Sequence, residues 1–124
     1  MKDKYLIFLQ LNELNFDYIE QYSKKYDFKN FRKLLGFNKV HTTSESKYEL
    51  LEPWIQWVSA FTGLEASEHK VFRLGDSKKF NLMYIFEILE KKGFKVGCIA
   101  PMNIVNNLIK PSYFISDPWI KTKN

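Results

Sequence analysis

A continuous apolar run close to the N-terminus, YLIFL at residues 5–9, strongly limits the folds open to this chain. A strand with one face in water alternates apolar and polar side chains, whereas a strand covered on both faces of a parallel sheet is apolar throughout. The run therefore predicts a central strand of a parallel sheet. Residues 94–100 form a second, mostly apolar run that Pro101 ends, and residues 112–115 and 38–41 are weaker strand candidates.

Helical patterns separate these candidate strands. Pro53 suits the first turn of a helix and Gly63 suits the left-handed position after the last turn, so the residues between them predict one helix. Helices are also expected over residues 17–25, over 28–35 after an Asp27 cap, and over 80–92 before Gly93. The apolar stripe of the helix after Pro53 consists of Trp54, Trp57, Val58 and Phe61.

Strands that alternate with helices favour an α/β fold. We predict a small, mostly parallel sheet with helices on both faces. A chain of 124 residues fits a single domain, residues 1–124. The aromatic content of 17% favours either a dense core or surfaces that bind a partner.

The net charge of +5 would permit binding to polyanions, but the lysines are scattered, mostly at the ends of predicted helices. No nucleic-acid-binding motif accompanies them, so a nucleic-acid partner is not expected. The lone Cys98 excludes an internal disulfide and is typical of a small core residue. The N-terminal apolar run is too short for a transmembrane segment and has no signal-peptide cleavage site, so we expect a cytoplasmic or membrane-peripheral location.

Three features resemble the alkaline phosphatase superfamily, which includes phosphodiesterases and sulfatases. The first apolar run ends in Leu11-Asn12-Glu13, where the family places a metal-binding Asp after its first strand. A helix ends in Thr62-Gly63, and His69 follows seven positions after the threonine. The strand at residues 94–100, followed by Asp117-Pro118-Trp119, extends the resemblance over nearly the whole chain.

The resemblance implies a hydrolase or transferase of phosphate or sulfate esters that uses a divalent cation, Zn²⁺, Mn²⁺ or Mg²⁺. Asn12 and Glu13 are the implied metal ligands, and Glu13 is the better one because a carboxylate carries charge. The residues that the resemblance implies line or support the site are Trp54, Gln56, Trp57, Thr62, Gly63, His69 and Asp76.

Two departures from the family limit the expected activity. The family nucleophile, a Thr, Ser or modified Cys, lies nine positions before the Thr of Thr-Gly, and here that position is Pro53, which cannot attack a phosphorus atom. The family also binds its metals through further Asp and His residues of a longer domain, whereas this chain has only two histidines. We therefore expect the N-terminal portion of an alkaline-phosphatase-like domain, incomplete at its active site and without a catalytic residue of its own.

The same residues also permit other interpretations. Asn12 and Asn15 are ordinary turn formers, and His69 is more typical of a structural histidine than of a metal ligand. The chain is alternatively a non-catalytic α/β module that forms a homo-oligomer or binds a partner chain through aromatic surfaces. A polyanion-binding protein is a weaker interpretation, supported only by charge and aromatic content.

Overall fold

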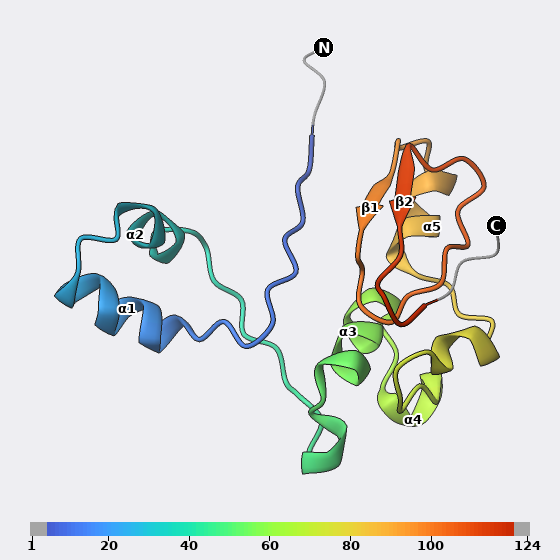
Figure 1. The fold of residues 1–124 in the computed structure, drawn as a ribbon, viewed down its shortest axis with the longest axis horizontal. Helices are drawn as coiled ribbons and strands as arrows, with labels where there is room; N and C mark the ends of the chain where they lie inside the picture. Colours follow the sequence, from blue (N-terminus) through green and yellow to red (C-terminus); the bar gives the residue numbers. More distant parts are fainter. Residues whose placement is uncertain (1–4, 121–124) are drawn as a thin grey trace. The chain divides into compact units, whose positions relative to one another are not determined.

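The computed structural model describes residues 5–120, and the chain divides into two units, Met1–Thr43 and Ser44–Asn124. Figure 1 shows a pair of helices in the first unit and a small helix-and-sheet assembly in the second. No helix within residues 5–120 is both long enough and apolar enough to cross a membrane.

The first unit contains two helices, α1 (Phe16–Lys25) and α2 (Lys29–Leu35), which pack against each other. Asn15 is the N-cap of α1, and its side-chain oxygen accepts hydrogen bonds from the backbone N–H groups of Asp17 (2.8 Å) and Tyr18 (3.2 Å). Both predicted helices are confirmed to within about a residue at each end. The predicted Asp27 cap is wrong, because Phe28 is the N-cap of α2 and no side chain caps this helix. Among the described residues of this unit, only Ile19 and Ser23 are buried.

The predicted strand at residues 5–9 is wrong, and so is the weaker one at residues 38–41. Both segments lie outside any strand, and Tyr5, Leu6 and Ile7 are more than 80% exposed. An apolar sequence alone does not make a strand, because the backbone N–H and C=O groups of a strand must pair with those of a neighbouring strand. No strand among the described residues pairs with either segment.

The second unit carries the sheet, which consists of two parallel strands, β1 (Gly97–Ile99) and β2 (Tyr113–Ile115), with Cys98 aligned with Phe114. The parallel sheet is thus confirmed in a smaller form. The strands follow a series of short helices. These are η1 (Tyr48–Leu50), α3 (Pro53–Thr62), α4 (Ala66–His69), η2 (Asp76–Lys79) and α5 (Ile85–Lys91).

The helix after Pro53 is confirmed at both ends, because α3 begins at Pro53 and Gly63 adopts the left-handed conformation with φ of 73°. Its buried side chains are Ile55, Val58 and Phe61, whereas the two predicted stripe tryptophans are half-buried. The helix predicted over residues 80–92 is shorter than expected. It begins at Ile85 because the Glu87 carboxylate accepts a hydrogen bond from the backbone N–H of Tyr84, the N-cap.

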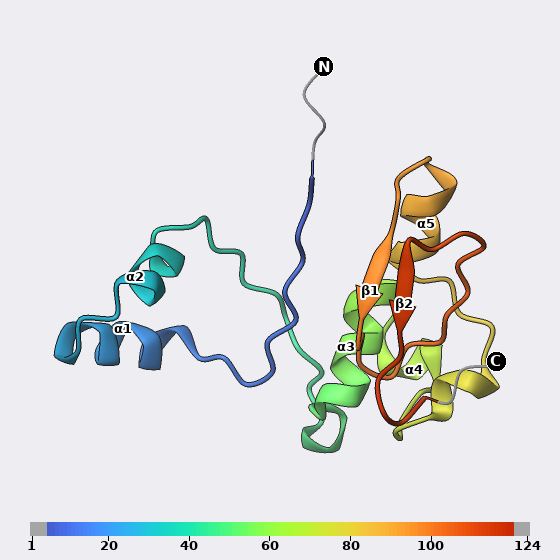
Figure 2. The same cartoon turned by 45° about the horizontal axis from the view of Figure 1, so that its top comes forward.

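The core of the second unit lies between the helices and one face of the sheet. One buried cluster joins α3 to the segments that follow it, and a second joins Val96, Cys98 and Leu108 to the side chains of Phe86 and Leu89 on α5. Both views show α5 lying along the two strands (Figures 1 and 2). The members of the first cluster are Val58, Phe61, Val71, Tyr84 and Ile104.

The opposite face of the sheet is not covered by a helix in the described part of this unit. Ile99 and Ile115 are register partners and are 69% and 57% exposed, and Tyr113 beside them is 52% exposed. The prediction of helices on both faces is therefore wrong. The central strand that was expected at residues 5–9 is not part of this sheet, which consists of β1 and β2 in the described part of the chain.

Candidate functional site

The residues predicted for the site fall in both units. Asn12 and Glu13 occupy a turn in the first unit, both are exposed, and Glu13 has a positive φ of 57°. The remaining seven lie in the second unit, on α3 or in the segments that follow it. Within residues 5–120, no group of three or more His, Cys, Asp or Glu side chains is placed to hold a metal ion.

His69 is fully buried at the end of α4 and contacts α3. Its Nε2 atom lies 3.0 Å from the hydroxyl of Ser59, and its Nδ1 atom accepts a hydrogen bond of 3.0 Å from the backbone N–H of Val71. Because Nδ1 is an acceptor, the ring proton of the neutral imidazole resides on Nε2, which donates to Ser59 Oγ. His69 in this tautomer cannot remove the Ser59 proton, so the pair is not an activated nucleophile.

Burial lowers the pKa of His69 below its ordinary value of 6.5, although the carboxylates of Glu45 and Glu68 oppose the shift. The imidazole is therefore neutral at pH 7. This protonation state agrees with a ring that accepts at one nitrogen and donates at the other. The geometry supports the structural interpretation of His69.

Thr62 and Gly63 form the turn that connects α3 to α4. The Thr62 hydroxyl donates to the backbone oxygen of Val58 at 2.7 Å and accepts from the backbone N–H of Leu64 at 3.2 Å. The Glu45 carboxylate accepts a 2.8 Å hydrogen bond from the backbone N–H of Ala66, the first residue of α4. A helix of one turn such as α4 cannot pair its own terminal backbone groups. The hydroxyl of Thr62 and the carboxylate of Glu45 therefore stabilise this turn and the start of α4.

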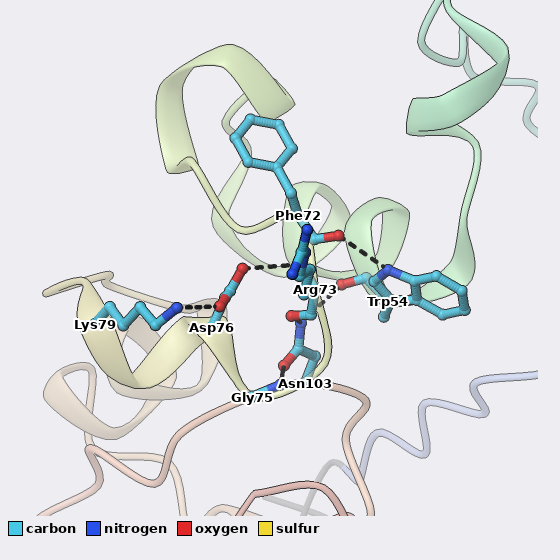
Figure 3. A network of polar contacts seen from close by, with 7 residues as sticks. All are labelled: Trp54, Phe72, Arg73, Gly75, Asp76, Lys79 and Asn103. Atoms are coloured by element: carbon cyan, nitrogen blue, oxygen red, sulfur yellow. Dashed lines mark hydrogen bonds and ion pairs between the residues drawn. The ribbon is translucent and has the colours of Figure 1, made fainter.

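Trp54 and Asp76 belong to a polar network beside α3 (Figure 3). Trp54 Nε1 donates to the backbone oxygen of Phe72 at 3.1 Å. The Asp76 carboxylate accepts from the backbone N–H of Arg73 at 3.1 Å and lies 2.6 Å from Lys79 Nζ. The Lys79 hydrogen bond holds the pKa of Asp76 below its ordinary value, so this carboxylate is ionised near neutral pH.

Asn103 completes this network, and the sequence did not point to it. Its side chain is fully buried, accepts from the backbone N–H of Gly75 at 2.8 Å, and donates to the backbone oxygens of Trp54 (3.0 Å) and Arg73 (3.1 Å). Its own backbone N–H donates to the Asp117 carboxylate. The sequence signal that could have indicated Asn103 is its position shortly after the predicted strand at residues 94–100. Its backbone has a left-handed φ of 58°, which asparagine tolerates better than most residues.

Gln56 and Trp57 also make contacts within the chain. Gln56 Nε2 donates to the backbone oxygen of Leu50 at 2.7 Å, which connects α3 to η1. The Trp57 ring stacks on Phe61 with centroids 5.7 Å apart. Trp54, Thr62, His69 and Asp76 make similar contacts. Residues 52–76 are therefore held together by hydrogen bonds between polar side chains and backbone groups of the same unit.

Comparisons with known proteins give no family assignment. No protein-family model matches the chain, and no curated protein or solved structure matches it. The resemblance to the alkaline phosphatase superfamily therefore stays a prediction that depends on the quoted motifs.

Replacing His69 with glutamine tests its structural role through pH. Because the folded-state pKa is lowered, the contribution of His69 to stability is present above its ordinary value of 6.5 and is lost as pH falls through the folded-state pKa. We expect His69→Gln to lower the unfolding free energy by about 1–2 kcal/mol at neutral pH and to flatten the decline in stability as the pH falls below the ordinary histidine pKa of 6.5.

Urea unfolding followed by tryptophan fluorescence at several pH values measures this decline, since all three tryptophans lie in the second unit. His41→Gln changes the other, exposed histidine and should keep the wild-type pH dependence. An unchanged slope in His69→Gln would contradict the assignment.

Asn103→Asp tests the polar network with almost no change in side-chain volume. The amide NH₂ that donates to Trp54 and Arg73 becomes a carboxylate oxygen facing two carbonyl oxygens, so we expect a loss of about 2–4 kcal/mol in unfolding free energy at pH 7. The matched control is Asn107→Asp, because Asn107 is exposed and donates once, to the Leu82 oxygen. Urea denaturation should show a loss of about 1 kcal/mol or less in the control, and equal losses would refute the special role of Asn103.

Proposed function

We propose that this chain supplies the N-terminal part of a metal-dependent hydrolase or transferase that acts on phosphate or sulfate esters, as in the alkaline phosphatase superfamily. The observation that supports the proposal most directly is the way in which the Thr62-Gly63 and His69 motif is held against α3. Thr62-Gly63 ends α3, and His69 returns to contact Ser59 on the same helix. A motif fixed in this way can hold neighbouring groups in the geometry that a catalytic site needs.

Asn12 and Glu13 are the metal-binding pair in this proposal. Oxygen ligands suit Mg²⁺ and Mn²⁺, and a carboxylate such as that of Glu13 also binds Zn²⁺. Glu13 supplies the charge and the Asn12 side chain supplies an amide oxygen, so the pair provides part of a coordination shell. Pro53, the first residue of α3, has no nucleophilic atom, and we therefore assign no nucleophile to this chain.

Calorimetric titration of the full chain with Mn²⁺, Zn²⁺ and Mg²⁺ tests this proposal. We expect the double variant Asn12→Ala/Glu13→Gln to bind the preferred ion about tenfold more weakly than the wild type, or not at all, because the charged ligand is removed. Glu49→Gln removes an exposed carboxylate from η1 and should leave the titration unchanged. Absence of binding to the wild-type chain, or equal binding by the double variant, would refute the assignment of this pair.

A second candidate function is supported by the uncovered face of the sheet. Ile99, Tyr113 and Ile115 place exposed apolar side chains on adjacent strands, while α5 packs on the opposite face. Two short parallel strands bury little surface alone, and exposed apolar side chains on a sheet are typical of an interface. We therefore propose a non-catalytic α/β module that associates with a second copy through this face as the alternative to the hydrolase.

Sedimentation velocity over a wide range of protein concentrations tests the alternative. We expect the wild type to associate as its concentration rises and Ile99→Lys/Ile115→Lys to stay monomeric, because each copy would have to bury two ammonium groups at the interface. Ile109→Lys is the matched control, since Ile109 is 81% exposed and lies outside the two strands. A wild-type chain that remains monomeric throughout, or a control that dissociates like the double variant, would contradict the proposal.

A further inference from the structure

The helical pair in the first unit carries a dense group of cations. Residues 24–33, with the sequence KKYDFKNFRK, contain five basic side chains and one carboxylate, that of Asp27. All five are exposed, and they lie at the end of α1 and along α2. The basic residues are Lys24, Lys25, Lys29, Arg32 and Lys33.

Aromatic side chains are interleaved with these cations and contact one another in a row. The ring centroids of Tyr22 and Tyr26 are 6.2 Å apart, those of Tyr26 and Phe28 are 5.6 Å apart, and those of Phe28 and Phe31 are 5.9 Å apart. We call these four residues the aromatic row. Each of them is more than 40% exposed within a unit that buries only Ile19 and Ser23 among its described residues.

We propose that the aromatic row and the surrounding lysine and arginine side chains bind an anionic phospholipid surface, with α1 and α2 lying in the headgroup region. Aromatic rings insert favourably at the boundary between headgroups and acyl chains, and basic side chains can bury their stems while their charged ends contact lipid phosphates. Charge complementarity selects the partner, because five cations within ten residues meet the negative potential of an anionic bilayer.

The geometry of the rings favours a membrane over single-stranded nucleic acid. Base stacking needs a free ring face, but Tyr22 and Tyr26 stack on each other with an interplanar angle of 12°. Lys25 Nζ also lies 5.3 Å from the centroid of the Tyr26 ring. Bases would have to displace these contacts, whereas insertion into a bilayer requires only the exposed edges of the rings.

The intramolecular ion pairs of this region do not prevent lipid binding. Lys24 lies 2.9 Å from Glu20 and Lys29 lies 3.8 Å from Asp27, and Arg32 also contacts the Asp27 carboxylate. Each of these side chains is at least half exposed. Exposed pairs of this kind are weak, so lipid phosphates can replace the carboxylates as partners. This inference concerns the first unit alone and is independent of the proposed enzymatic function.

Co-sedimentation of the full chain with vesicles tests the inference. We expect binding to vesicles of phosphatidylcholine mixed with phosphatidylglycerol, little binding to phosphatidylcholine alone, and release at high salt. Lys29→Gln/Lys33→Gln should weaken binding by about fivefold for each cation removed. Phe28→Ser/Phe31→Ser should weaken binding by about tenfold or more, because two inserted rings are lost.

Matched controls distinguish binding by this surface from nonspecific hydrophobic adsorption and from attraction by the net positive charge of the chain. Phe94→Ser removes an exposed ring, and Lys91→Gln/Lys92→Gln removes two exposed cations, all in the second unit, so both controls should bind like the wild type. Circular dichroism checks that the variants keep their helices. Equal binding to neutral vesicles, the same loss in the controls, or binding to a poly-dT oligonucleotide in place of the vesicles would overturn the proposal.

Discussion

The arrangement of the second unit depends on the hydrogen bonds of one buried amide. An asparagine side chain removed from water must have partners for its oxygen and its NH₂ group, because each unpaired group carries a large desolvation cost. Asn103 meets this requirement with Gly75, Trp54 and Arg73, which belong to the first turn of α3 and to the segment before η2. Its backbone N–H reaches Asp117, so the segment between β1 and β2 and the residues after β2 are held in the same network.

The same principle accounts for the contacts of many of the predicted site residues. Trp54, Gln56 and Thr62 each use a polar side-chain atom to bind a backbone oxygen, and His69 binds both a backbone N–H and a serine hydroxyl. A short helix such as α4 cannot satisfy its own terminal groups, and the Glu45 carboxylate provides one of the missing acceptors. Residues 52–76 therefore resemble a supporting element, and reactive groups would have to be placed around it.

The two units bury apolar surface to very different extents. The second unit has two buried clusters, and Phe86 of α5 and Phe114 of β2 pack against both of them. Val58, Tyr84 and Ile104 in the first cluster are fully buried. Helices α1 and α2 leave most of their aromatic side chains in contact with solvent. Each unit therefore has an exposed apolar surface that could bind a partner. In the first unit it consists of aromatic rings beside cations, and in the second unit it is the uncovered face of the sheet.

Local chemistry alone determined the boundaries of several helices. Pro53 and Gly63 set the ends of α3, and Asn15 caps α1, because proline, glycine and a capping amide act within a single turn. Tertiary structure decided the rest. Residues 5–9 have the composition of a buried strand, but no strand in the described part of the chain pairs with them. Asn103 joins residues that are 28 and 49 positions away. Strand pairing and buried hydrogen bonds depend on groups that are distant in the sequence, and no local pattern specifies which of those groups will meet.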